Sequence, residues 1–280
     1  MKLAFSTNAF TRHSLDFAID SIAAAGYTGI EILADKPHWY PDSFDERAAE
    51  ILREKLHHLR LEVSNVNANC TFGYFKDAPA EPFFEPSLIS PNPAHRADRI
   101  RMIQNTLQFA KTIGADNISI TSGKALPTMP PDAAMRQLCE SLSPVLETAE
   151  KLKVRVGFEC EPGLFIEWAT ELRDLIDRLG SRMLGANLDI GHSVVLGEDI
   201  SATLKLLKGR IWNCHIEDLP GKKHYHLIPG TGTMDWTALK GSLQDIKYNR
   251  FLTVELYSYP DRPVEAAQQS IDYLHRIFGE

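Results

Sequence analysis

Short apolar runs alternate with longer amphipathic segments along the whole chain. The short runs are rich in β-branched residues, whereas the longer segments repeat their apolar residues three and four positions apart, as helices do. We expect eight strands, at 3–6, 29–33, 61–67, 117–121, 154–159, 185–189, 211–216 and 251–256. Helices are expected between and after them, at about 15–25, 45–59, 99–113, 132–152, 168–179, 199–208, 236–246 and 263–277.

Capping residues support these boundaries. Ser14 precedes the first helix and Asp132 opens the fourth, where oxygen-bearing or acidic side chains are favoured. Gly26, Gly114 and Gly180 follow helices, where a left-handed cap is common.

A strand–helix unit repeated eight times predicts a single-domain (β/α)8 barrel over residues 1–280, with parallel strands and right-handed crossovers. A doubly wound open sheet is the alternative, but its nucleotide-binding forms carry a glycine-rich first turn, and the turn STNAFTRH contains no glycine. The irregular segment at about 69–93 follows the third strand, so it is expected over the C-terminal face, as a lid or as packing on the rim.

Composition narrows the class of protein. The net charge of −7 argues against duplex nucleic acid and against a polybasic membrane anchor. No apolar run approaches the roughly 18 residues of a spanning helix, and the first apolar run is too short for a signal peptide. The cysteines form no CxxC pair and are expected to be reduced, which predicts a soluble, cytoplasmic protein. They are Cys70, Cys139, Cys160 and Cys214.

The last four predicted strands each end in a carboxylate or an imidazole, at Glu159, Asp189, His215 and Glu255. In a barrel these strand ends meet at one mouth, where buried charges are costly unless they are paired or bind a cation. Salt bridges to lysine or arginine are the alternative, although few basic residues lie at the neighbouring strand ends. The pattern favours one divalent ion, and these ligand types suit Mn²⁺, Mg²⁺, Co²⁺ or Zn²⁺.

The segment after the seventh predicted strand contains KKHYHLIPGTGTMDW at 222–236. Its Gly-Thr-Gly is not a dinucleotide-binding motif, because no strand leads into it. We interpret it as a turn that carries His224 and His226 back over the barrel mouth, with solvation as the alternative for His224.

These motifs together resemble the xylose-isomerase-like barrel superfamily, in its sugar phosphate isomerase/epimerase and ketose 3-epimerase branch. The matching residues are FE at 158–159, NLDIGH at 187–192, CHIED at 214–218, HLIPGTGTMDW at 226–236 and TVEL at 253–256. The resemblance covers essentially the whole chain. It implies one divalent ion held by Glu159, Asp189, His215 and Glu255, and a carbohydrate or polyol substrate.

The resemblance also implies substrate contacts by His192 and by His226, which stands where ketose 3-epimerases place an arginine. The substrate therefore stays open, as do its phosphorylation and the oligomeric state. Glu161 points to the same face as Glu159 and is expected to assist or replace it. The other candidates are Asn8 and Asn67 as substrate contacts, and Asp218 and His224 behind the site or at a second metal.

The chemistry that fits this set is proton transfer next to a carbonyl. A metal stabilises the enediolate, and Glu159 and Glu255 act as acid and base on its two faces. An isomerase or epimerase is the first hypothesis. A dehydratase of the inosose or dehydroshikimate type, a phosphodiesterase like endonuclease IV, and a binding barrel without turnover are the alternatives. Endonuclease IV carries extra histidines at strands three and four, where this chain has Asn67 and Thr121.

Overall fold

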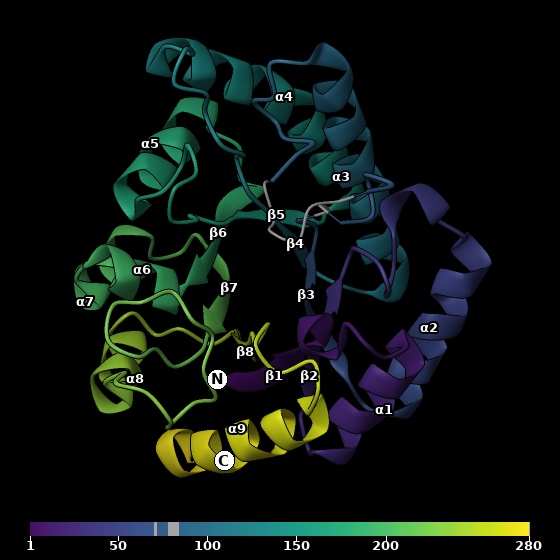
Figure 1. Cartoon of the computed structure of the whole chain (residues 1–280), viewed down its shortest axis with the longest axis vertical. Helices are drawn as coiled ribbons and strands as arrows, with labels where there is room; N and C mark the ends of the chain where they lie inside the picture. The colour runs from purple at the N-terminus through teal and green to yellow at the C-terminus, as the bar shows by residue number, and fades with distance from the viewer. Residues whose placement is uncertain (70–71, 78–83, 280) are drawn as a thin grey trace.

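A closed barrel of eight parallel strands forms the centre of the computed structural model, which describes residues 1–69, 72–77 and 84–279. Each strand pairs with the next in chain order and β8 pairs with β1, which closes the barrel (Figure 1). The strands are β1 Lys2–Ser6, β2 Gly29–Leu33, β3 Glu62–Asn67, β4 Asn117–Ile120, β5 Arg155–Phe158, β6 Leu184–Asp189, β7 Ile211–Ile216 and β8 Phe251–Val254. The predicted fold is confirmed.

Helices surround the barrel as a ring, and the C-terminal helix α9 completes it beside α1 and α8 (Figure 1). The α-helices are α1 Leu15–Ala24, α2 Glu46–His58, α3 Pro93–Ile113, α4 Pro131–Leu152, α5 Ala169–Leu179, α6 Ile190–Leu196, α7 Ile200–Leu206, α8 Trp236–Asp245 and α9 Pro263–Phe278. Two short 3-10 helices, η1 Thr7–Phe10 and η2 Pro41–Ser43, follow β1 and β2.

The caps predicted at Ser14, Gly114 and Gly180 are confirmed. Asp132 lies in the first turn of α4, which has no side-chain cap, and Gly26 follows Ala25, the C-cap of α1. The Ser14 side chain accepts from the Phe17 amide at the start of α1. Gly114 and Gly180 close α3 and α5 in the left-handed conformation. Helix α3 starts earlier than expected, at Pro93, because the Asn92 side chain caps it there.

Helix α6 was not predicted. It begins directly after β6, and Asp189 is its N-cap: the carboxylate accepts a hydrogen bond from the His192 amide. A seven-residue segment is too short to show a helical period in sequence. This helix places His192 one turn beyond the end of β6, over the mouth of the barrel.

The irregular segment at about 69–93 falls partly outside the described residues, which omit 70–71 and 78–83. In its described part, Leu88 and Ile89 are buried in the core.

Cys139, Cys160 and Cys214 are free thiols, as expected, while Cys70 lies outside the described part. None of the described helices combines the length and the apolar character needed to cross a bilayer.

Candidate metal centre and cavity

Four side chains converge at the C-terminal mouth, as the sequence predicted. Glu159 and Glu255 directly follow β5 and β8, while Asp189 and His215 lie in β6 and β7. One ligand atom from each lies within 4.8 Å of the others. All four side chains are buried, and none of them pairs with a lysine or arginine in the described part of the chain; their charged neighbours are carboxylates and histidines.

The donor atoms fit a divalent ion. Asp189 uses Oδ1 to cap α6, at 2.8 Å from the His192 amide, whereas its buried Oδ2 has no hydrogen-bond partner among the described residues. Nδ1 of His215 lies 2.9 Å from Glu159 Oε1 and 3.5 Å from Glu255 Oε2. Three carboxylates and one imidazole are ligands that Mn²⁺, Mg²⁺, Co²⁺ or Zn²⁺ accept, and a cation would relieve the mutual repulsion of the carboxylates.

Glu31 supports this centre from behind and was not among the predicted site residues. Its Oε2 lies 2.6 Å from Nε2 of His215 and accepts a hydrogen bond of 2.7 Å from the Asn65 side chain. A carboxylate on the far ring nitrogen is the usual device that fixes the orientation of a metal-binding histidine. The available signal was a lone acidic residue in the apolar strand GIEIL at 29–33.

The charges of the centre are strongly coupled. Burial alone would lower the pKa of His215, but the carboxylates of Glu255, Glu31 and Glu159 outweigh it and raise that pKa well above its usual value. Burial raises the pKa of Glu255, against the effect of His215. Protons therefore neutralise part of this cluster, and a bound cation would compete with them.

Two asparagines orient the carboxylates. The Asn67 amide donates to Glu255 Oε1 at 3.1 Å, and the Asn69 amide donates to Glu159 Oε2 at 3.3 Å. The end of β3 thus offers hydrogen-bond donors to the centre, not additional imidazole ligands. Asn8 is buried in η1 and is absent from the described residues that line the cavity.

A second group, of three histidines, lies beside the centre. His192, His224 and His226 also bring one ring nitrogen each within 4.8 Å of the others. Nδ1 of His192 donates to the Cys160 carbonyl, and Nδ1 of His226 donates to the Glu255 carbonyl, both at 2.9 Å. Burial lowers the pKa of His226 to about 4, so its Nε2, which lies 3.2 Å from His224 Nε2, is a lone-pair acceptor. Burial would also lower the pKa of His192, but the carboxylates of Asp189 and Glu161 outweigh it and raise that pKa to about 9. Nε2 of His192 therefore carries a proton near neutral pH, which a second cation would have to displace.

Glu161 joins the histidines. Its Oε2 lies 3.7 Å from His192 Nε2, and its Oε1 lies 4.0 Å from His224 Nδ1. Burial raises the pKa of Glu161 to about 7, although His192 opposes the shift. The carboxyl is thus suited to carry a proton near neutral pH.

Asp218 lies outside both groups. It anchors the predicted turn after β7, because its carboxylate accepts from the amides of Gly230 and Met234 and from the Trp236 indole, at 2.8–3.1 Å. A Cβ added at Gly232 would lie 2.3 Å from Asp218 Oδ1, too close for any side chain. This contact explains why the second glycine of the Gly-Thr-Gly turn is needed. The turn brings the loop histidines over the mouth, as predicted.

Glu217, directly after β7, is a further buried carboxyl that was not among the predicted site residues. It is fully buried, and neither carboxyl oxygen has a hydrogen-bond partner among the described residues. It fills the space left by Gly191, where an added Cβ would lie 1.6 Å from Oε1. Burial, reinforced by Asp189 and Glu255, raises the pKa of Glu217 well above its usual value.

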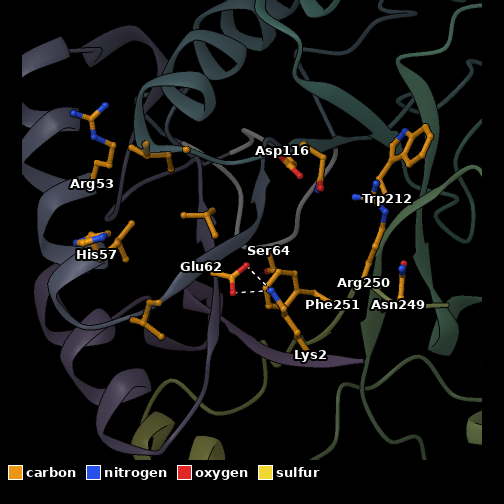
Figure 2. Close-up of a pocket in the computed structure, with 16 residues that line it drawn as sticks. Lys2, Arg53, His57, Glu62, Ser64, Asp116, Trp212, Asn249, Arg250 and Phe251 are labelled. Carbon is orange, nitrogen blue, oxygen red and sulfur yellow. Dashed lines mark hydrogen bonds and ion pairs between the residues drawn. The ribbon is translucent and has the colours of Figure 1, made fainter.

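A cavity of about 590 Å³ opens over both groups, a size typical of small-molecule sites. Its buried lining residues include Glu159, Glu255, His192 and His226, and its more exposed lining residues include His224, Phe72, Phe84 and Tyr257. We call the aromatic part of the exposed lining, Phe72, Phe84 and Tyr257, the outer wall. Another cavity, of about 440 Å³, lies at the opposite end of the barrel, lined by the residues that begin the strands (Figure 2).

The comparisons with known proteins agree with this geometry. A fructoselysine 3-epimerase from Escherichia coli O157:H7 is 23% identical over 284 residues, covering 100% of this chain and 99% of that protein. An inosose dehydratase from Clostridium perfringens (strain 13 / Type A) is 22% identical over 281 residues, covering 94% and 89%. The solved structure of the IOLI protein with a bound zinc atom superposes with a TM-score of 0.80 at 19% identity, covering 100% and 98%, and shows the shared fold.

The family description matches most of the chain. The match runs over residues 19–277, so it includes both the strands that carry the four converging side chains and the loop that carries His224 and His226. The chain belongs to the Xylose isomerase-like TIM barrel family.

Proposed function

We propose that this protein is a divalent-metal-dependent isomerase or epimerase that acts on a keto-sugar, a sugar phosphate or a related polyol through an enediolate. The observation that carries the proposal is the convergence of four ligand atoms within 4.8 Å at the floor of an open cavity. The similarity to a 3-epimerase over the full length of the chain supports it.

Glu159, Asp189, His215 and Glu255 would hold one ion, which the zinc-bound neighbour supports without fixing the metal. When bound, the ion supplies positive charge that lowers the free energy of the enediolate. Glu159 and Glu255 directly follow strands β5 and β8, and both approach His215 Nδ1. One carboxylate removes the proton next to the carbonyl, and the other returns a proton to the opposite face.

The remaining groups bind and orient the substrate. With both Nδ1 protons donated to backbone carbonyls, Nε2 of the protonated His192 donates to a substrate oxygen, and Nε2 of the neutral His226 accepts from a substrate hydroxyl. Glu161, next to His192, adds a further polar contact. Asn67 orients the carboxylate of Glu255, and Asn8, buried in η1, stays a candidate substrate contact.

Turnover in D₂O tests this assignment. A carboxylate exchanges its proton with solvent between steps, so the carbon next to the carbonyl must acquire deuterium, which mass spectrometry or NMR detects. Glu159→Gln and Glu255→Gln each remove a base, and each should lower turnover by roughly 10²–10⁴-fold or more. Full activity in either variant, or epimerisation without deuterium uptake, would contradict the proposed mechanism.

A dehydratase is the second candidate function. The inosose dehydratase similarity supports it, and so does Glu161, which burial holds near a pKa of about 7. A protonated Glu161 could donate to a leaving hydroxyl after the same proton abstraction. Product mass separates the two functions, since dehydration loses one water and epimerisation loses nothing.

We place the protein in the cytoplasm, which the free thiols of Cys139, Cys160 and Cys214 support.

A further inference from the structure

The outer wall of the C-terminal cavity is aromatic and partly exposed. Phe72 and Tyr257 line it together with Phe84, and they leave 44% and 46% of their surfaces exposed. A concave patch of exposed aromatic surface next to convergent polar groups is typical of a wall that a ligand covers.

Asp35, which also lines the cavity, holds the backbone at Phe72. The Asp35 carboxylate accepts from the backbone amides of Phe72, Gly73 and Lys36, at 2.7–2.9 Å. Gly73 is required here, because an added Cβ would lie 2.3 Å from the Tyr40 ring. The backbone that carries the Phe72 ring is therefore anchored to Asp35.

The same wall lacks the features that bind phosphate. Phosphate sites use arginine, lysine or free backbone amides. Lys36 is the only lysine or arginine among the described lining residues, and its Nζ lies 5.3 Å from the centroid of the Tyr40 ring. The backbone amides of Phe72, Gly73 and Lys36 are already donated to Asp35, and the carboxylates of Glu159 and Glu255 line the same cavity.

We infer that this outer wall is a subsite for an uncharged, apolar-faced ring attached to the sugar, so that the substrate is a neutral keto-glycoside and not a sugar phosphate. The inference rests on the proposed function, which places the keto-sugar between Glu159 and Glu255. The ring of the substituent would then cover Phe72 and Tyr257, because these side chains line the same cavity and are far more exposed than Glu159 and Glu255.

Calorimetric titration of the metal-loaded protein tests the subsite without turnover. Phenyl β-D-glucopyranoside should bind about tenfold more tightly than methyl β-D-glucopyranoside, because only the phenyl ring buries the aromatic wall. D-Glucose 6-phosphate should bind no more tightly than the methyl glycoside. Phe72→Ala should abolish the preference for the phenyl compound, and Tyr257→Leu should weaken it.

Phe17→Ala is the matched control, since Phe17 is also 44% exposed but lies on α1, away from this cavity. It should leave the tenfold preference intact. Equal binding of the two glycosides, no binding of either, or tighter binding of the phosphate would overturn the inference. An aryl preference without turnover of any keto-sugar would contradict the proposed function and leave the subsite standing, whereas turnover without the preference would do the reverse.

Discussion

The two ends of the barrel both carry charged side chains around a cavity, but they neutralise the charges differently. At the amino ends of the strands, Lys2 and Glu62 form an ion pair of 2.6 Å with about half of each side chain exposed (Figure 2). The guanidinium groups of Arg155 and Arg250 lie 5.0 and 5.4 Å from the centroid of the Trp212 ring. Each of these charged groups is exposed to water, paired with an opposite charge or placed over an aromatic ring.

At the carboxyl ends, the carboxylates of Glu159, Asp189 and Glu255 are at most 4% exposed and have histidine neighbours. Burying charge in this way is costly unless a cation or a proton compensates. A cavity with charged walls is therefore not by itself a site. Burial of like charges around one point is what distinguishes the C-terminal mouth, and this difference can be tested.

The largest effect is expected from Asp189→Ala. It removes the buried Oδ2 that faces the cluster and also the cap of α6. Stoichiometric metal binding should be lost, and turnover should fall by at least roughly 10²–10³-fold, because the charge that stabilises the reacting oxygens is gone. Elemental analysis after dialysis measures the metal. One ion per chain in this variant would place the metal elsewhere.

Glu31→Gln is expected to have the next largest effect. The amide keeps the shape of the side chain but loses the negative charge on His215 Nε2, so metal affinity should fall roughly 10–100-fold. Glu62→Gln is the matched control, since it makes the same change on β3 at the opposite mouth. It should leave metal affinity unchanged, and an equal loss in both variants would contradict a special role for Glu31.

Metal affinity should rise with pH. The facing carboxylates raise the pKa of His215, so the metal-free protein holds a proton there that the ion must displace. Affinity should increase about tenfold per pH unit until the pH passes this raised pKa. By the same linkage, this histidine stabilises the metal-free fold most at low pH, and that stability is lost as pH rises. Affinity that does not change between pH 6 and 8 would contradict this coupling.

The smallest effect is expected at the amino mouth. Breaking the exposed Lys2–Glu62 pair with Lys2→Ala should change the free energy of unfolding by about 1 kcal/mol or less. Deuterium uptake and metal content should stay at the wild-type level. A large loss of activity in this variant would mean that the amino mouth also takes part in function.

Much of the site was readable because it depends on local features. A carboxylate or imidazole directly after an apolar run marks a strand end, and the closed barrel brings such ends together, so Glu159, Asp189, His215 and Glu255 could be grouped in advance. Glu31 could not be paired with His215, because they are far apart in sequence and meet only across the barrel. The sequence did not mark Phe72 as a cavity residue, because an aromatic residue in a loop can equally well pack against the rim of the barrel.

The sequence by itself determined the order of strands and helices and the residue types at each strand end, since hydrophobic period and capping act over a few neighbouring residues. The tertiary structure alone decided where each side chain points. His215 faces the cluster, whereas Asp218, three residues later, turns away to anchor the loop. Glu161 joins His192 and His224, not Glu159. Side-chain direction and partners are set by packing between segments distant in the chain, which local pattern does not encode.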